Sequence, residues 1–397
     1  EADMIFTFDS SQPGAPVLSG AAGALRAVVK ACAVDGFGAG AVASLTVASG
    51  VATATYAGAH PFKAGHVAQY DGATPAALNG NKVILSATGN SVTFAAPGVP
   101  DGAASGTITS KAAPAGWQEL FAGTLANVIA LKPSVPEATG CVLRINDTTT
   151  SRARVVGYEV MTGINTGTGR FPTEAQFAGG LYLPKSDAAT TAARPWRMYI
   201  SERVMILAVA PHESYPDSYG VYVLGDFVSS KGVDPYACMV SGGGLGVSNA
   251  SGGSALDGSA AISSRTSSDH ACYVARGALG IGGPLVLNKL GPLASSSRLF
   301  SGSSGYATMP LTFPNPSDNS LRVGPVDLYQ GGDLRGVLPG VYHSPQPLIG
   351  SGAFATGQRI VGQGPYADRI FEAITVGDPG NSAVGVAFVD ISGPWGV

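Results

Sequence analysis

Short runs in which apolar and polar residues alternate recur along most of the chain, and the densest lie between residues 194 and 240. The first covers 196–200, the second 204–209 and the third 220–226, with breaks rich in polar residues between them. Alternation with a period of two is typical of β-strands. The pattern therefore predicts three adjacent antiparallel strands, and we expect them to start a sheet that buries one face.

One segment, residues 19–35, has a helical period instead. Its apolar residues recur at i, i+3, i+4 and i+7 and form one stripe, which consists of Leu25, Val28, Val29 and Cys32. We expect a helix that packs on a sheet by this stripe, with Ser19 capping its start and Gly36 at its end. Residues 38–43 match a G-x-G-x-x-A pattern, but they follow a helix, whereas a dinucleotide site needs a preceding strand. We therefore predict no nucleotide cofactor.

Residues 44–111 form a block of closely spaced short strands separated by Gly, Pro and Asn turns. The predicted strands are 44–47, 51–56, 67–70, 82–86, 91–94 and 106–110. So many strands in so short a segment indicate a small barrel or sandwich. We interpret this block as a domain inserted into a larger one.

The rest of the chain carries further strand patterns, over 4–8, 141–146, 155–161, 321–323, 326–329, 369–376 and 384–391. We expect the last strand, which runs toward Trp395, to lie beside the early strands and close the main sheet. The prediction is a mainly β fold: a β-sandwich or barrel-like main domain with one N-terminal helix and an inserted small β-barrel. The main domain covers residues 1–43 and 112–397, and the barrel covers 44–111.

Two stretches lack a strand pattern. Residues 241–269 are almost entirely Gly, Ser, Ala and Asn, and such a run cannot bury enough apolar surface to offset the entropy of ordering. We expect either a loop that is mobile or ordered only by a neighbouring subunit, or a flexible linker. Residues 286–320 mix short apolar phrases with Ser and Pro, and we expect irregular structure there.

The composition narrows the possible partners. Charged residues make up only 12% of the chain and the net charge is −3, and a surface so poor in charge is typical of extracellular or partner-covered proteins. Arg152 and Arg154 are the nearest approach to a basic cluster, so we expect no nucleic-acid partner. No apolar run reaches the roughly 18 to 20 residues of a membrane span. The isolated cysteines at 32, 141, 238 and 272 indicate buried thiols rather than a disulfide framework.

Candidate catalytic and metal-binding residues are few. His60 and His66 lie six residues apart with no further ligands nearby in sequence, so we predict no metal site. Carboxylates that a polysaccharide-degrading enzyme could use gather around the three central strands, at Glu202, Glu213, Asp217, Asp226 and Asp234. Asp at strand ends is usually turn chemistry. We therefore predict no enzyme, no catalytic residues and no cofactor, and keep the hydrolase as an alternative.

Aromatic residues also cluster around these three strands, at Trp196, Tyr199, Tyr215, Tyr219, Tyr222 and Tyr236. Aromatic side chains supply a large contact area at low entropic cost. The cluster is therefore a candidate subunit interface or sugar-binding platform. The alternative is that about half of these side chains belong to the core.

Part of the inserted block resembles a known module. The phrases at 49–55, 59–60, 65–67, 72–80 and 91–94 are similar to a small β-barrel that recurs as an insertion in virion proteins of tailed bacteriophages. That barrel is similar in fold to the first-catalytic-cysteine half-domain of ubiquitin-activating enzymes. The half-domain carries no catalytic residue, so the resemblance implies a structural insert.

The flanking phrases extend the resemblance over nearly the whole chain. Those at 8–20, 34–38, 224–229, 234–237, 334–342 and 393–395 look like a set of tailed-phage structural proteins. The resemblance implies a virion protein, most readily of the tail, as a ring, nozzle or tail-tip part that assembles with copies of itself and other tail proteins. The alternative is a fibre-like or capsid-decorating protein that binds the host surface.

Overall fold

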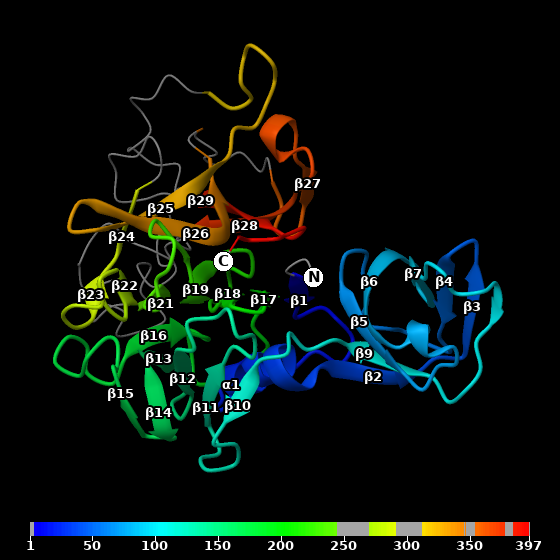
Figure 1. The fold of residues 1–397 in the computed structure, drawn as a ribbon, viewed down its shortest axis with the longest axis horizontal. Coiled ribbons are helices and arrows are strands. Elements are labelled where there is room, and N and C mark those ends of the chain that lie inside the picture. Colours follow the sequence, from blue (N-terminus) through cyan, green and yellow to red (C-terminus); the bar gives the residue numbers. More distant parts are fainter. Residues whose placement is uncertain are drawn as a thin grey trace.

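The computed structural model describes residues 4–243, 270–290, 312–344, 346, 354–377 and 384–396. It is mainly β, as predicted, with one short α-helix near the N-terminus. The strands form sheets of 12, 8 and 7 strands and one separate hairpin, β14 (Val160–Gly163) with β15 (Thr166–Thr168). Figure 1 shows the 8-stranded sheet projecting from one side of a body that the other two sheets build.

The main sheet is antiparallel throughout and contains the three central strands that alternation predicted. Along its path lie β1 (Phe6–Asp9), β17 (Trp196–Ile200), β18 (Val204–Val209), β19 (Gly220–Asp226), β21 (Cys238–Gly243), β16 (Leu181–Pro184), β13 (Arg152–Tyr158), β12 (Val142–Asn146), β11 (Val128–Lys132) and β10 (Gln118–Leu120), with β22 (His270–Val274) and β23 (Leu285–Val286) branching from β21. The central meander β17–β18–β19 has the predicted bounds, and its strands pair consecutively.

The single helix starts later than expected. Helix α1 (Ala24–Lys30) continues as a π-helical turn to Asp35, and Gly36 at φ 75° ends it as predicted. The prediction that Ser19 caps it is wrong, because Ser19 lies four residues before the N-cap position at Gly23. The cap comes instead from Asp147, in the turn after β12, whose Oδ2 accepts hydrogen bonds from the backbone N–H groups of Leu25 (2.7 Å) and Arg26 (3.1 Å).

The main sheet curls around α1. The predicted stripe is fully buried and shares one core with inward-facing residues of most strands of the sheet, among them Leu143, Leu181 and Leu207. Deep beside the helix start, the Lys185 ammonium forms an ion pair with Asp147, and neither side chain is exposed to solvent. The helix therefore lies inside the curl and is fastened to it at its N-terminus.

The meander buries both faces, so the expectation of one buried face is wrong. Every residue of β18 and β19 is buried. Side chains such as Leu207 point toward the helix, whereas Ile206 and Val223 belong to a second core on the other face. A third sheet covers that face, because the residues there are as apolar as those on the helix side.

The third sheet contains β24 (Asn288–Leu290), β25 (Gly324–Gln330), β26 (Asp333–His343), β29 (Val384–Asp390), β28 (Ile370–Gly377) and β27 (Arg359–Val361), with β20 (Val228–Ser229) beside β26. The last strand does not close the main sheet, as had been expected, but pairs with β26 and β28. The segment 321–323 is not a strand. Trp395 is buried in the core between the two sheets, and its Nε1–H donates to the Asp390 carbonyl at 2.8 Å.

The 8-stranded sheet is built by consecutive sequence from residue 37 to 112. Its order is β2 (Phe37–Ala41), β9 (Thr109–Ala112), β5 (Val67–Asp71), β6 (Gly80–Ala87), β7 (Ser91–Ala95), β4 (Val51–Thr55), β3 (Ser44–Ala48) and β8 (Gly102–Ala103), with a 3-10 turn at Ala76–Leu78. Its core is separate and is centred on Tyr70 and Phe94. We call residues 37–112 the barrel module and the rest the body.

Parts of two expectations lie outside the described residues. Of the Gly/Ser-rich stretch 241–269, only 241–243 are described, as the end of β21. Of 286–320, residues 291–311 are not described, whereas β24 is a short strand within the segment that was expected to be irregular. No helix in the described ranges is long and apolar enough to span a membrane.

Candidate functional site

The six aromatic residues named from sequence do not form one platform. Trp196, Tyr199, Tyr219 and Tyr222 are buried, two in the core around the helix and two in the core between the sheets. Tyr236 is half-buried, and only Tyr215 is substantially exposed, at 40%. Alternation along the strands sends the four buried side chains to opposite faces, and both faces are covered.

The carboxylates around the meander are tied to structural partners. Asp226 is buried and accepts hydrogen bonds from the backbone N–H (2.9 Å) and hydroxyl (2.6 Å) of Thr139 and from Arg203 Nε (3.1 Å). Burial raises the pKa of Asp226. Asp234 forms an ion pair with Arg335. Each carboxylate thus holds a loop to a neighbouring strand.

A cavity of about 490 Å³ lies beside this region, but it does not join the two aspartates. Arg203 and Asp234 line it, whereas Asp226 does not. Glycoside hydrolysis needs two carboxyl groups on either side of one sugar bond. Asp226 and Asp234 do not meet in this cavity.

The two histidines of the barrel module are buried in separate surroundings. The His66 ring lies 3.0 Å from Gln12 Nε2, and burial lowers the pKa of His66 to about 4. The His60 ring stacks on Phe62 with centroids 5.7 Å apart. Among the described residues, no group of three or more His, Cys, Asp or Glu is placed to hold a metal ion. All four cysteines are buried and none forms a disulfide, as predicted.

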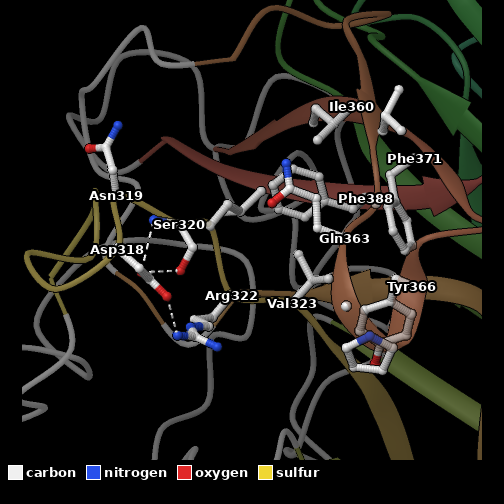
Figure 2. Close-up of a pocket in the computed structure, with 15 residues that line it drawn as sticks. Asp318, Asn319, Ser320, Arg322, Val323, Ile360, Gln363, Tyr366, Phe371 and Phe388 are labelled. Carbon is white, nitrogen blue, oxygen red and sulfur yellow. Dashed lines mark hydrogen bonds and ion pairs between the residues drawn. The ribbon is translucent and has the colours of Figure 1, made fainter.

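A cleft of about 550 Å³ opens on the third sheet (Figure 2). Its floor is apolar and includes the buried rings of Phe371 on β28 and Phe388 on β29. Ile360 of the edge strand β27 and Tyr366 of the following 3-10 turn (Gly364–Tyr366) form one wall. The Tyr366 ring meets Phe371 edge-on, with centroids 5.7 Å apart, which fixes the wall to the floor.

The opposite rim of the cleft is polar. Asp318 Oδ1 accepts hydrogen bonds from the backbone N–H (3.1 Å) and hydroxyl (2.6 Å) of Ser320, and these bonds lower the pKa of Asp318. Its other oxygen pairs with Arg322 at 2.6 Å. Asn319 between them adopts a left-handed backbone with φ 59°. The rim is thus a tight turn whose side chains are already paired with one another (Figure 2).

The cleft suits binding better than reaction. Pockets with an aromatic floor and a few polar groups are typical of ligand sites. The residues that line it include no Ser, Cys or Lys beside a His, the arrangement that nucleophilic catalysis uses. Sequence reasoning missed the cleft because Phe371 and Phe388 follow ordinary strand alternation, which predicts burial but not a neighbouring opening. The D-x-S turn signal at 318–320 was the available hint.

A second surface stands out at the end of the body away from the barrel module. Four apolar side chains on three loops are exposed there: Val233 at 81%, Leu279 at 76%, Ile281 at 75% and Leu334 at 48%. Lys231 Nζ donates to the Ala278 carbonyl (2.8 Å) and Ser230 Oγ to the Leu334 carbonyl (2.9 Å), so the loops are joined. We call these four residues the apolar tip. Figure 1 places β23 and the turn between β25 and β26 at this end.

Comparison of the chain with protein-family models and with curated proteins found no match.

Proposed function

We propose that this chain is a structural subunit of a tailed-phage virion, placed in the tail, where it assembles with copies of itself and with other tail proteins. The observation that carries the assembly role is the apolar tip. Exposed apolar clusters on joined loops mark protein–protein contact sites. The placement in a virion rests on the sequence resemblance described above.

The shape of the subunit supports such assembly. The apolar tip lies at one end and the barrel module at the other (Figure 1). A subunit that repeats around a symmetry axis can bury the tip against its neighbour and leave the barrel free. The low charge of the chain fits a surface that is largely covered in the particle.

The projection of the barrel module favours a second role, host-surface binding, for the same subunit (Figure 1). Removal of residues 42–108 would test it. Particles that assemble normally but no longer adsorb to cells would assign recognition to the barrel. Particles that adsorb normally would exclude this role.

The copy number in intact particles tests the proposal directly. Quantitative mass spectrometry against the portal protein should find about six or twelve copies, or a small multiple, because tail rings have closed symmetry. Hundreds of copies would place the chain on the capsid as a decoration. Absence from the particle would overturn the proposal.

Substitutions in the apolar tip test the assembly surface on the purified chain. Leu279→Asp with Ile281→Asp should lower the oligomer mass in light scattering to that of a single chain. The matched control is Val83→Asp with Leu85→Asp on β6, where the side chains are 44% and 54% exposed but belong to the barrel module. Assembly that survives the first pair, or fails equally in both, would contradict the role of the tip.

A further inference from the structure

The fold enlarges the small basic cluster that the sequence contains. Arg154 on β13 is the direct cross-strand partner of Asn146 on β12. Side chains two apart on a strand share a face, so Arg144 and Arg152 lie on the same face as this pair. The opposite face of both strands belongs to the core around the helix. The arginines therefore lie on the outer surface of the main sheet.

A fourth arginine arrives from a loop. Residue 171, just after Arg170, bridges to Gly157 of β13, with N–H to carbonyl distances of 2.8 and 2.9 Å in both directions. A side chain at position 157 would collide with the Phe171 ring, since a Cβ there would lie 2.1 Å from it. The glycine thus lets the loop lie flat on the strand, and Arg170 lies beside Arg144.

Together they line a cavity of about 230 Å³ with Asn146, Asn165 and Tyr158. Arg144 is held in place, because its Nε donates to the Ile164 carbonyl (2.7 Å) and its Nη2 to Asn165 Oδ1 (2.6 Å). Burial lowers the pKa of Arg144, and the nearby charge of Arg170 lowers it further. The fold thus holds two guanidinium groups close together despite their mutual repulsion.

One carboxylate lines the cavity, and it lies at the outside. Glu174 pairs with Arg170 and accepts a hydrogen bond from the Gly179 N–H (2.9 Å), while its side chain is 68% exposed. Arg154 flanks the cavity, with its guanidinium 3.8 Å from the centre of the Tyr182 ring. Its Nη1 is buried and has no hydrogen-bond partner among the described residues. Three arginines thus face a single acid.

We propose that this cavity, between Arg144 and Arg170, is a binding site for a small oxyanion, a carboxylate or phosphate group. Guanidinium groups suit both because their planar N–H donors match the paired oxygens. The amide of Asn146 and the hydroxyl of Tyr158 supply neutral hydrogen-bonding groups at the same cavity. The volume admits one such group and its near neighbours but not a large ligand. This site is independent of the proposed assembly role.

Isothermal titration of the purified chain at low salt tests the site with inorganic phosphate, glucuronate and neutral glucose. Phosphate or glucuronate should bind saturably and more weakly as salt rises, and glucose should not bind. Binding of phosphate alone would narrow the ligand to phosphates, and binding of glucuronate alone to carboxylates. No binding of either anion, or equal binding of glucose, would overturn the proposal.

Two substitutions should act in opposite directions. Arg170→Gln should weaken anion binding at least about tenfold, because it removes one of the two facing charges. Glu174→Gln should tighten binding by about threefold or more, because it removes the competing carboxylate. Both residues lie at the partly exposed side of the cavity, and thermal melts would verify that the variants fold.

The matched control is Arg322→Gln. Arg322 also pairs with an acid at i,i+4 spacing, but in the rim of the cleft on the third sheet. Anion binding should be unchanged in this variant. A loss equal to that of Arg170→Gln, or no gain from Glu174→Gln, would show that binding follows overall charge and would overturn the proposal.

Discussion

The central strands of the body and the strands of the barrel module have similar alternating sequences but different burial. In β18 every residue is buried, whereas in β3 exposed and buried residues alternate. The difference lies in what covers the second face. The helix packs on one side of β18 and the third sheet on the other, while β3 faces a core on one side only. Burial of a strand is therefore decided by its neighbours as much as by its own pattern.

The two regions also differ in the polar groups that they bury. The body encloses a charged pair, Asp147 with Lys185, at the start of its helix. The barrel core contains a neutral chain of hydroxyls, in which Tyr56 Oη lies 3.0 Å from both Tyr70 Oη and Ser110 Oγ. A buried charge that loses its partner is far more costly than a lost neutral hydrogen bond. The body should therefore be the more sensitive to loss of one polar group.

The largest effect is expected for Asp147→Ala. It leaves the Lys185 ammonium buried without its partner and removes the cap of α1, so unfolding free energy should fall by about 4 kcal/mol. Denaturant unfolding would measure the loss, and hydrogen exchange would locate it. Amides of α1 should lose protection while those of the barrel module keep theirs.

A control for this prediction replaces both members of the pair. Asp147→Leu with Lys185→Met removes the charges together and should recover part of the stability, because no unpaired charge remains. A single Asp147→Ala variant as stable as the parent would contradict the importance of the buried pair. Equal loss of protection in the barrel module would remove the contrast between the regions.

Two neighbouring residues of β18 test the burial of both faces. Ile206 and Leu207 point into different cores, and neither is exposed by more than 1%. Replacing either one by Ala should cost about 3 kcal/mol, because each leaves a cavity in a packed core. Denaturant unfolding of the two single variants gives the values. A cost below about 1 kcal/mol for either residue would mean that its face is not packed as described.

Acidification tests the join between barrel module and body. His66, held near Gln12, has its pKa lowered by burial to about 4, so the folded chain binds this proton less readily than the unfolded chain, whose pKa is about 6.5. Stability from the neutral ring is complete above pH 6.5 and falls as the pH drops toward 4, by about 2–3 kcal/mol. Unfolding free energies at pH 7 and pH 4 give the change.

The substitution His66→Gln provides the control for this dependence, since Gln does not titrate. Asp9 contributes lower in the pH range: burial alone would raise its pKa, but hydrogen bonds from Lys63 and Ser11 lower it to about 2. That contribution is present above pH 4 and is lost between pH 4 and 2. An unchanged pH dependence between 7 and 4 in His66→Gln would refute the role assigned to His66.

The smallest effects are expected from the matching pair in the barrel module. Val47 on β3 is buried, so Val47→Ala should cost about 2 kcal/mol through lost apolar contact. Its neighbour Thr46 is exposed, so Thr46→Ala should change stability by less than about 0.5 kcal/mol. Thermal unfolding of both variants would show the split. Equal costs at the two positions would mean that something covers the outer face of β3.

Local pattern predicted most individual elements and missed most long-range relations. The strands of the meander and the end of the helix at Gly36 follow from periodicity and from glycine chemistry. The cap at Asp147 lies 122 residues from Leu25 in sequence, and no local rule links them. Likewise, the stacking of the C-terminal strands on the meander depends on a face that only the folded sheet creates.

The sites were less predictable than the elements. The aromatic cluster around the meander was chosen by proximity in sequence, but alternation splits it between two cores. The cleft on the third sheet and the arginine cavity both combine strands with loops that are distant in sequence or irregular. Only the pair at 152 and 154 gave a local signal for the cavity, and the fold supplies Arg144 and Arg170.

The way in which the barrel module joins the body has a consequence for how such chains change over evolutionary time. Its first strand, β2, and its last, β9, are antiparallel partners, with Phe37 opposite Ala112. The two points where the chain crosses into and out of the module are thus neighbours, about 5 Å apart. A genetic deletion between them would need only a short turn to restore a continuous body, and an insertion there would disturb no core. The module can therefore be acquired, exchanged or lost as a unit while the rest of the gene stays intact.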